Sequence, residues 1–529
     1  MKKKFLNLLK SYLYKLKKNF IFETFLLISL GGLSSLSLPP FNFFFINFFT
    51  FSVFFTFLFK KLNNQASKKL FFYYGWFFGF GFFLSNLYWI TISLTFDEAF
   101  NFLIPITLFL VPSFLALFYA IMTLTFYSFK PQNILSAFFL FSLLFGLIEF
   151  IRGTILTGFP WNLIIYSFSQ NLNFISVISI IGTYSLNLIV ISFFIIPVLY
   201  IFRRSKKEII VSIILMILPI LFFTYGAFQK KQFSNSEFKE NPYTIRIIGS
   251  NISLERFYND TQSENIINEL RLISLPEKNK KIFFVWPEGI VSNIYRDELN
   301  LFSDIIGKYF SENHLIGLGI TSREKSGEDY KYYNSFSIFD NNFNLIDNYN
   351  KINLVPFGEF LPFEKTLNKI GLRPITNKIE SFSRGNIRKI LEIKDNYQQL
   401  KFLPLICYEI IYSGNLTKNS DYDFILNISE DGWFGKSIGP KQHFTHSVFR
   451  AIENGKYVIR SSNNGMAAII NPLGQIEKKI DYGKSGFIDF EKRRELNKTI
   501  FSTYGNKIFI ILILLYIFLT FSFNRIKNE

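Results

Sequence analysis

Residues 402–410 read FLPLICYEI, an apolar run that reaches Cys407, the only cysteine in the 529-residue chain. A short run of branched and aromatic residues such as this one predicts a buried β-strand. Functional side chains in α/β folds gather where a strand ends and a loop begins. A lone cysteine can also be an inert core residue. Its place at a strand end makes Cys407 a candidate nucleophile, which would need a base and a cation nearby.

A second predicted strand end carries a carboxylate. The segment IFFVWPEG (282–289) predicts a strand followed by Glu288. A carboxylate beside Trp286 and Pro287 suits a general base, because apolar neighbours raise a carboxyl pKa. Pro-Glu-Gly is equally good turn chemistry, so Glu288 alone leaves both interpretations open.

The candidate cation is Lys351, in the apolar stretch YNKINLVPFGEFLPF (349–363). A lysine there can stabilise an oxyanion or lower the pKa of a thiol. The alternative is an exposed loop lysine, the commoner fate of this residue type. Glu359, in the same stretch, either orients Lys351 or ends a turn. Glu288, Lys351 and Cys407 thus form a candidate Glu/Lys/Cys set.

The surrounding residues, 230–505, have the composition of a soluble domain and alternate two kinds of segment. Strands are predicted at 244–249, 282–286, 315–321, 402–407 and 423–428, and helices near 260–274, 297–310 and 442–454. This order predicts an α/β domain with largely buried strands.

The rest of the chain is strongly apolar. Hydrophobic residues make up 49% of the sequence, charged residues only 18%, and there are 70 phenylalanines, which excludes a disordered or fibrous protein. A bilayer core needs about 20 apolar residues per helix. Eight segments meet this length: 20–38, 41–59, 70–94, 102–129, 132–151, 174–202, 208–228 and 506–524. The predicted domains are therefore a seven-helix membrane domain (1–229), a catalytic domain (230–505), and a membrane helix with a short tail (506–529).

The net charge of +18 fits either nucleic acid or an anionic membrane as a partner. The basic residues cluster beside the apolar runs, as in KKLNNQASKK (60–69) and RRSKKE (203–208), and no nucleic-acid-binding motif is visible, so nucleic acid is excluded. Connections such as LPPF (38–41) and TFDEAFN (95–101) lack lysine and arginine. The positive-inside rule then predicts cytoplasmic N- and C-termini, the latter carrying Arg525 and Lys527, and a periplasmic catalytic domain.

Metal and disulfide chemistry find little support in the sequence. One cysteine cannot form an intramolecular disulfide, and with only three histidines a structural zinc site is not expected. We predict neither a metal nor a cofactor.

The motifs in chain order resemble a known superfamily. WPEG (286–289), NKINLVPFGEFLP (350–362) and ICYEI (406–410) resemble the carbon–nitrogen hydrolases, or nitrilase superfamily, which use Glu, Lys and Cys on an αββα sandwich. Three more stretches look like the apolipoprotein N-acyltransferase family: EFIRGTILTGFPW (149–161), ISEDGWFGKSIGPKQHF (428–444) and RSSNNGMAAIINPLGQI (460–476). The resemblance covers essentially the whole chain, including its membrane helices.

Three positions depart from the pattern of that family. It commonly has Asn where this chain has Glu430 and often Ala at Gly432, and it tends to carry a Trp near Phe257. These departures concern the shape of the acyl pocket and leave Glu288, Lys351 and Cys407 in place.

The resemblance implies a two-step acyl transfer in the inner membrane of a bacterium. Glu288 would take the proton of Cys407, whose sulfur attacks an acyl ester of a phospholipid donor while Lys351 stabilises the oxyanion. The thioester then passes its acyl chain to the N-terminal cysteine amine of a diacylated apolipoprotein. A monomer suffices for this chemistry.

Further residues have expected roles with stated alternatives. Glu359, Tyr408 and Glu409 would support the set; Trp433 and Phe434 would wall the acyl chain or pack as core; Asn334 would be a polar site residue or part of a turn; and Arg152 would meet a lipid phosphate or anchor a helix end at the interface.

Two other functions fit part of the sequence. A membrane-tethered amidase or nitrilase would use the same residues on a small substrate and would admit water. A transporter with an outer ligand-binding domain would need no nucleophile, but it usually shows repeat symmetry, which this sequence lacks.

Overall fold

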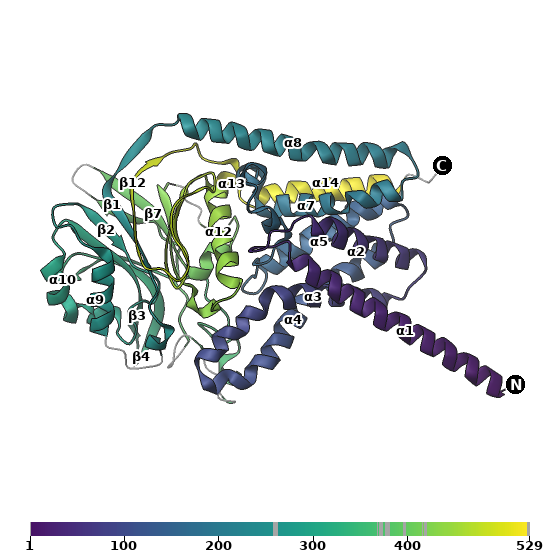
Figure 1. Ribbon diagram of the computed structural model, residues 1–529, viewed down its shortest axis with the longest axis horizontal. Coiled ribbons are helices and arrows are strands. Elements are labelled where there is room, and N and C mark those ends of the chain that lie inside the picture. The colour runs from purple at the N-terminus through teal and green to yellow at the C-terminus, as the bar shows by residue number, and fades with distance from the viewer. Residues whose placement is uncertain are drawn as a thin grey trace.

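The computed structural model describes residues 2–257, 263–367, 369, 374–375, 381–394, 398–414, 416 and 421–525, with side chains from Asn19 onward. The predicted tail residue Lys527 therefore lies outside the described residues. A helical bundle and a sheet domain lie side by side, with helix α12 (Gly439–Asn454) between them (Figure 1).

The bundle is built from the first half of the chain and closed by its last helix. Its long helices are α1 (Lys2–Ser35), α2 (Ile46–Asn63), α3 (Lys68–Leu87), α4 (Ile104–Phe129), α5 (Ile134–Thr154), α7 (Ile178–Ile201), α8 (Lys206–Asn235) and α14 (Lys507–Asn524). Short helices connect them: η1 (Tyr88–Phe96), η2 (Glu98–Leu103), η3 (Ile164–Phe168), α6 (Leu172–Ile175) and α13 (Ile500–Tyr504).

The expected count of eight membrane helices needs correction. Within the described residues, 6 helices are long and apolar enough to cross a membrane: Lys68–Phe96, Glu98–Phe129, Ile134–Thr154, Ile178–Ile201, Lys206–Asn235 and Lys507–Asn524. The other two predicted segments do form helices. However, the apolar part of α1, Asn19–Ser35, is shorter, and α2 ends on the polar residues Lys60, Lys61 and Asn63.

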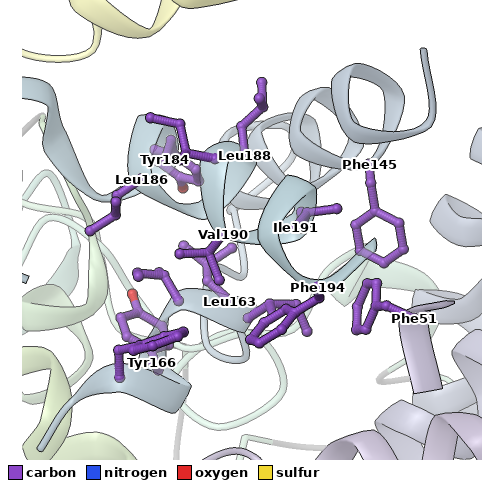
Figure 2. Packing of buried hydrophobic residues seen from close by; sticks show 14 of the residues in the cluster. Phe51, Phe145, Leu163, Tyr166, Tyr184, Leu186, Leu188, Val190, Ile191 and Phe194 are labelled. Carbon is purple, nitrogen blue, oxygen red and sulfur yellow. The ribbon is translucent and has the colours of Figure 1, made fainter. Parts of the chain in front are cut away.

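Phenylalanine rings fill the centre of the bundle. Figure 2 shows Phe51 beside Phe145 and Phe194, and the ring centroids lie 5.2 Å and 6.0 Å from that of Phe51. Close helix approach also depends on glycine, since a Cβ at Gly75 would lie 2.2 Å from the carbonyl oxygen of Tyr119 on α4.

The last helix, α14, packs against α5 and α7. The Asn133 side chain donates to the Phe523 carbonyl at 2.7 Å, and Ser136 donates to the Thr520 carbonyl at 3.1 Å. The hydroxyls of Ser192 and Tyr516 lie 2.9 Å apart. Helices far apart in sequence are therefore joined by polar contacts inside an apolar bundle.

The described residues of the sheet domain form twelve strands. They are β1 (Phe238–Ser250), β2 (Ile282–Val285), β3 (His314–Ser326), β4 (Asp329–Phe339), β5 (Leu345–Asn350), β6 (Leu391–Lys394), β7 (Gln399–Ile406), β8 (Phe424–Glu430), β9 (Tyr457–Asn463), β10 (Ala467–Ile470), β11 (Ile476–Ile480) and β12 (Gly486–Arg494). The described helices of this part, besides α12, are η4 (Leu254–Phe257), α9 (Ser263–Ser274), η5 (Arg296–Phe302), α10 (Ser303–Tyr309), α11 (Glu364–Leu367), η7 (Cys407–Ile411) and η8 (Asp431–Phe434).

All five predicted strands are confirmed. The three predicted helices correspond to α9, to η5 together with α10, and to α12, and residues 260–262 of the first prediction lie outside the described residues. The strand order is β5-β4-β3-β2-β1-β9-β8-β7-β6, with a parallel centre from β3 to β7 and antiparallel pairs at both ends. Strands β5 and β6 contact each other, so the sheet nearly closes on itself.

The closed sheet forms the predicted αββα sandwich. Its two halves face each other, with the rings of Phe283 and Phe402 5.8 Å apart. Helices α9 and α10 cover the outer face of the β1–β3 half, and α12 covers the outer face of the β7–β10 half. The core under α12 is continuous with the core of the bundle, so the two domains share one hydrophobic cluster.

A buried ion pair also joins the domains. The Arg450 guanidinium pairs with Glu453 at 2.7 Å and donates to Thr183 of α7 at 3.0 Å. The Glu453 carboxylate accepts from the Thr183 main-chain N–H at 2.9 Å and from Ser413 at 2.6 Å. These contacts fix the end of η7 against the kink that Gly182 makes in α7.

Candidate active site

Two candidate residues follow strands of the parallel centre, and Glu430 is the last residue of a third strand. Glu288 lies in the turn after β2, Cys407 directly follows β7, and Glu430 ends β8. Parallel strands present their carboxyl ends at one edge of the sheet, so these residues meet there. Lys351 joins them because it directly follows β5.

Glu288, Lys351, Glu359 and Asn334 form one hydrogen-bonded group. The Lys351 Nζ lies 3.1 Å from Glu288 Oε1 and 3.0 Å from Glu359 Oε1. The Asn334 amide donates to the same two oxygens at 2.8 Å and 2.7 Å. Asn334 lies within β4 and not in a turn, and Lys351 is 1% exposed and not a surface lysine.

The charges of this group are mutually dependent. Burial alone would lower the pKa of Lys351, but Glu288 and Glu359 outweigh it and hold that pKa above its ordinary value, so the ammonium stays charged. Burial raises the pKa of Glu359, with Lys351 opposing the effect. The arrangement therefore places the Lys351 ammonium between two buried carboxylates.

Cys407 lies in a strained backbone conformation beside this group. Its φ of +49° is in the left-handed region, which a non-glycine residue occupies at a cost. Burial, followed by the charge of Glu288, raises the thiol pKa well above its ordinary value, and Lys351 opposes this. The resting thiol is thus protonated, and it needs a base to become a nucleophile.

Glu409 holds the loops that carry the cysteine and the lysine. Its Oε1 accepts from the Tyr349 hydroxyl at 2.8 Å and from the main-chain N–H groups of Ile352 and Asn353 at 2.9 Å and 3.1 Å. Its Oε2 accepts from the Ile406 N–H at 2.9 Å. This carboxylate ties the residues flanking Lys351 to the residue preceding Cys407.

The sequence did not indicate a role for His443 in the site. Its Nε2 lies 3.2 Å from the Cys407 carbonyl oxygen, and its Nδ1 lies 2.9 Å from Asp431 Oδ1. Asp431 in turn accepts from Arg460 at 2.8 Å and from Ser429 at 2.7 Å. The spacing of His443 and His446 on one helix does not reveal this contact. The contact depends on how α12 packs on the sheet.

Tyr408 and the aromatic pair Trp433–Phe434 lie at the junction with the bundle. The Tyr408 hydroxyl donates to the Gly158 carbonyl at 2.9 Å. The ring of Trp433 lies 5.9 Å from that of Phe96, and the ring of Phe434 lies 4.9 Å from that of Trp89. Both aromatic residues therefore face η1 of the bundle.

Arg152 is not at the surface where a lipid phosphate would meet it. Its side chain is fully buried in α5, where it pairs with Glu149, donates to the Phe159 carbonyl and lies over the Phe83 ring. The guanidinium is thus occupied by the protein's own groups, and the expected phosphate contact is not carried further.

Metal ligands do not gather here. In the described part of the chain, no three or more His, Cys, Asp or Glu side chains are grouped so that they could hold a metal ion.

Comparisons with known proteins give matches to one family over most of the chain. The model of the apolipoprotein N-acyltransferase N-terminal domain matches residues 30–196, and the carbon-nitrogen hydrolase model matches residues 256–493. The apolipoprotein N-acyltransferase of Rickettsia bellii (strain RML369-C) is 35% identical over 87% of this chain and 89% of the relative. That of Agrobacterium fabrum (strain C58) is 31% identical over 95% of this chain and 96% of the relative. Among solved structures, a Saccharomyces cerevisiae member of branch 10 of the nitrilase superfamily has a TM-score of 0.32 and 18% identity, and the match covers 47% of this chain and 90% of that one.

Proposed function

Because the chain belongs to the apolipoprotein N-acyltransferase family, we propose that it moves an acyl chain from a phospholipid to the N-terminal cysteine amine of a diacylated apolipoprotein. The observation that carries this proposal is the buried pairing of Glu288 with Lys351 at the strand edge where Cys407 lies. A base, a cation and a protonated thiol are the parts that covalent acyl transfer needs.

The first half-reaction acylates Cys407. Glu288 takes the thiol proton, the sulfur attacks the ester carbonyl carbon, and Lys351 stabilises the oxyanion of the tetrahedral intermediate. The ester C–O bond then breaks, and the proton on Glu288 passes to the departing oxygen of the lysophospholipid. A thioester remains on Cys407.

The second half-reaction releases the acyl chain to the acceptor. The amine of the apolipoprotein attacks the thioester carbon and gives a proton to Glu288. The C–S bond breaks as the amide forms, and the thiolate regains the proton from Glu288. Glu359 and Asn334 support this cycle by holding Lys351 and Glu288 in place, and Glu409 does so by joining the two loops.

The contacts between domains support access for a lipid. Tyr408 contacts the Gly158 loop of the bundle and Phe434 contacts Trp89 of η1, so the site lies beside the bundle whose helices cross the membrane. We propose that Trp433 and Phe434 line the path of the acyl chain. An apolar path also excludes water from the thioester, which favours transfer over hydrolysis.

The chain is a multi-pass membrane protein of a bacterial family. We propose residues 1–229 and 506–529 as its membrane parts, residues 230–505 as a periplasmic catalytic domain, and cytoplasmic termini. The outer ends of α1 and α14 lie on the side of the bundle away from the sheet domain, which supports this orientation (Figure 1). If neither α1 nor α2 crosses the membrane, the number of crossings before the sheet domain is still odd. The sheet domain then still lies on the opposite side of the membrane from the N-terminus. We propose that the protein works as a monomer.

An amidase that acts on a small substrate is the less favoured alternative. It would share the catalytic set, but the family match includes the membrane domain at residues 30–196. A hydrolase of small amides has no need for that domain.

Intact-mass spectrometry of the purified protein after incubation with phospholipid tests the proposal. We expect one fatty-acyl mass on the wild type, absent from Cys407→Ser, and its removal by a diacylated lipopeptide that gains the same mass. A wild-type protein that forms no adduct but hydrolyses small amides would establish the amidase alternative instead.

A further inference from the structure

A buried ion pair lies on the side of Glu288 opposite to Lys351. Arg256, in η4, donates from Nη2 to Glu430 Oε2 at 2.5 Å, and the side chains are 1% and 2% exposed. A charge pair this deeply buried costs desolvation and is weak evidence for stability alone. Its contacts with the neighbours of Glu288 indicate a more specific role.

Glu430 touches Glu288 through its main chain. The Glu430 N–H donates to Glu288 Oε2 at 3.0 Å, whereas the other oxygen of Glu288 accepts from Lys351 and Asn334. The two oxygens of the carboxylate are therefore held by different elements. The position of the Glu430 main chain sets the rotation of the carboxylate about its last bond.

Arg256 holds the turn that carries Glu288. Its Nε donates to the Ile290 carbonyl at 3.1 Å, and its Nη2 donates to the Gly289 carbonyl at 3.3 Å. Its Nη1 donates to the Ser253 carbonyl at 2.9 Å. The planar guanidinium reaches these acceptors and Glu430 at the same time, which the single ammonium of a lysine cannot do.

The Glu430 side chain is fixed from its other side as well. Its Oε2 accepts from the Asn463 amide at 2.7 Å, and its Oε1 accepts from the Gly432 N–H at 2.9 Å. Burial raises the pKa of this carboxyl, and Arg256 opposes the shift. The Glu430 carboxylate is therefore held in place by Asn463 and Gly432, and the Arg256 guanidinium binds to it.

We propose that Arg256 and Glu430 are positioning residues that hold Glu288 in the orientation in which it takes the proton from Cys407. One guanidinium joins the turn after Glu288 to the residue whose N–H holds its second oxygen. The inference rests on the proposed role of Glu288 as the base.

Two conservative variants test the pair. Arg256→Lys keeps the charge but loses the multiple carbonyl contacts, and Glu430→Gln keeps the shape but loses the charge. The readouts are the single-turnover rate of Cys407 acylation at several phospholipid concentrations and the alkylation rate of Cys407 by iodoacetamide. We expect each variant to lower both rates about tenfold or more, as for a misplaced general base, with unchanged half-saturation by phospholipid.

The Glu288→Gln background separates positioning from general destabilisation. If the pair acts through Glu288, Arg256→Lys and Glu430→Gln lower the alkylation rate by less than about twofold once Glu288 has been replaced. An equal loss in both backgrounds, or no loss in the wild-type background, overturns the inference. Arg323→Lys is the matched control, because Arg323 pairs with Asp297 and Glu298 on the surface of the same domain.

The outcomes also distinguish this inference from the proposed function. A wild-type protein that never acquires an acyl mass refutes the acyl-transfer proposal, while the alkylation rates still report on the positioning of Glu288. Normal acylation in both variants refutes the inference and leaves the proposed function standing.

Discussion

The Nε2 of His443 lies 3.2 Å from the carbonyl oxygen of Cys407, so a helix of the domain junction touches the backbone of the candidate nucleophile. A carbonyl oxygen only accepts, so Nε2 carries the proton. Burial, then Arg460, lowers the pKa of His443, and Asp431 opposes the shift. The Nδ1 atom lies 2.9 Å from Asp431 Oδ1 and 3.1 Å from the Arg460 guanidinium. Trp161 of the bundle stacks on this ring, with centroids 5.3 Å apart. The bundle is thus connected to the Cys407 backbone through the rings of Trp161 and His443.

Replacing His443 with Phe should weaken the hold on Cys407. The variant keeps a ring for Trp161 to stack on but removes the donor to a buried carbonyl, which costs about 1–3 kcal/mol. We expect a lower melting temperature and slower acylation of Cys407, measured by intact mass. His446→Phe, on the same helix, is the control and should leave the acylation rate unchanged. Equal rates in both variants would show that the His443 contact is dispensable.

Glu409→Gln should loosen both loops of the site. The amide nitrogen replaces one of the two carboxylate oxygens. It therefore places a donor opposite either the N–H groups of Ile352 and Asn353 or the N–H group of Ile406. We expect a loss of about 1–3 kcal/mol for a buried donor left without an acceptor. Thermal unfolding and the acylation rate should both fall, because Glu409 joins the Lys351 loop to Cys407. Unchanged unfolding would contradict the role of Glu409 as a link.

Gly319→Ala should displace Glu288 without touching its side chain. A Cβ at Gly319 would lie 2.5 Å from the Cα of Glu288 and 2.9 Å from the main-chain nitrogen of Gly289. We expect overpacking of about 1–3 kcal/mol and slower acylation. Gly307→Ala is the control, since the nearest atom to its Cβ would be 3.8 Å away. Wild-type kinetics for Gly319→Ala would mean that β3 does not constrain Glu288.

Acid should destabilise the protein through two buried histidines. Burial, followed by Arg460 for His443 and by Arg450 for His446, lowers both pKa values. The unfolded chain binds protons below about pH 6.5, whereas the native chain does not, so stability is present above that pH and is lost as the pH falls. The expected slope is up to about 1.4 kcal/mol per pH unit for each histidine. Melting temperatures between pH 7.5 and about 5 should fall less steeply in His446→Phe than in the wild type; equal slopes would exclude His446 as a source.

The residues at strand ends were the most predictable part of the site. Apolar runs that alternate with helical segments predicted five strands, all of which are present, and Glu288 and Cys407 were candidates because each follows one of them. Lys351 and Asn334 come from antiparallel strands at the other end of the sheet order, and only the curl of the sheet brings them to the same point. The role of Asn334 therefore could not be separated from that of a turn residue by pattern alone.

Burial and pairing were the least predictable properties. Arg152 looked interfacial because it lies near the end of an apolar helix, but its partner Glu149 is one turn away and draws the guanidinium inward. The sequence did not indicate a role for Arg256, because that role depends on the carbonyl groups of Gly289 and Ile290 in a turn distant in sequence. The helix count was too high because hydropathy windows ignore where a helix acquires polar ends, as α2 does at Lys60 and Lys61.

The hydrogen bonds that join α14 to Asn133, to α5 and to α7 have a consequence for biosynthesis. The ribosome makes α5 and α7 long before α14, with the whole sheet domain in between. During that interval Asn133, Ser136 and Ser192 lack the partners that the finished protein gives them, and such groups are costly to leave facing lipid. The nascent protein is therefore an unfinished bundle until its final helix inserts. A chain truncated before Lys507 should be recognised by membrane quality control even where its catalytic residues are intact.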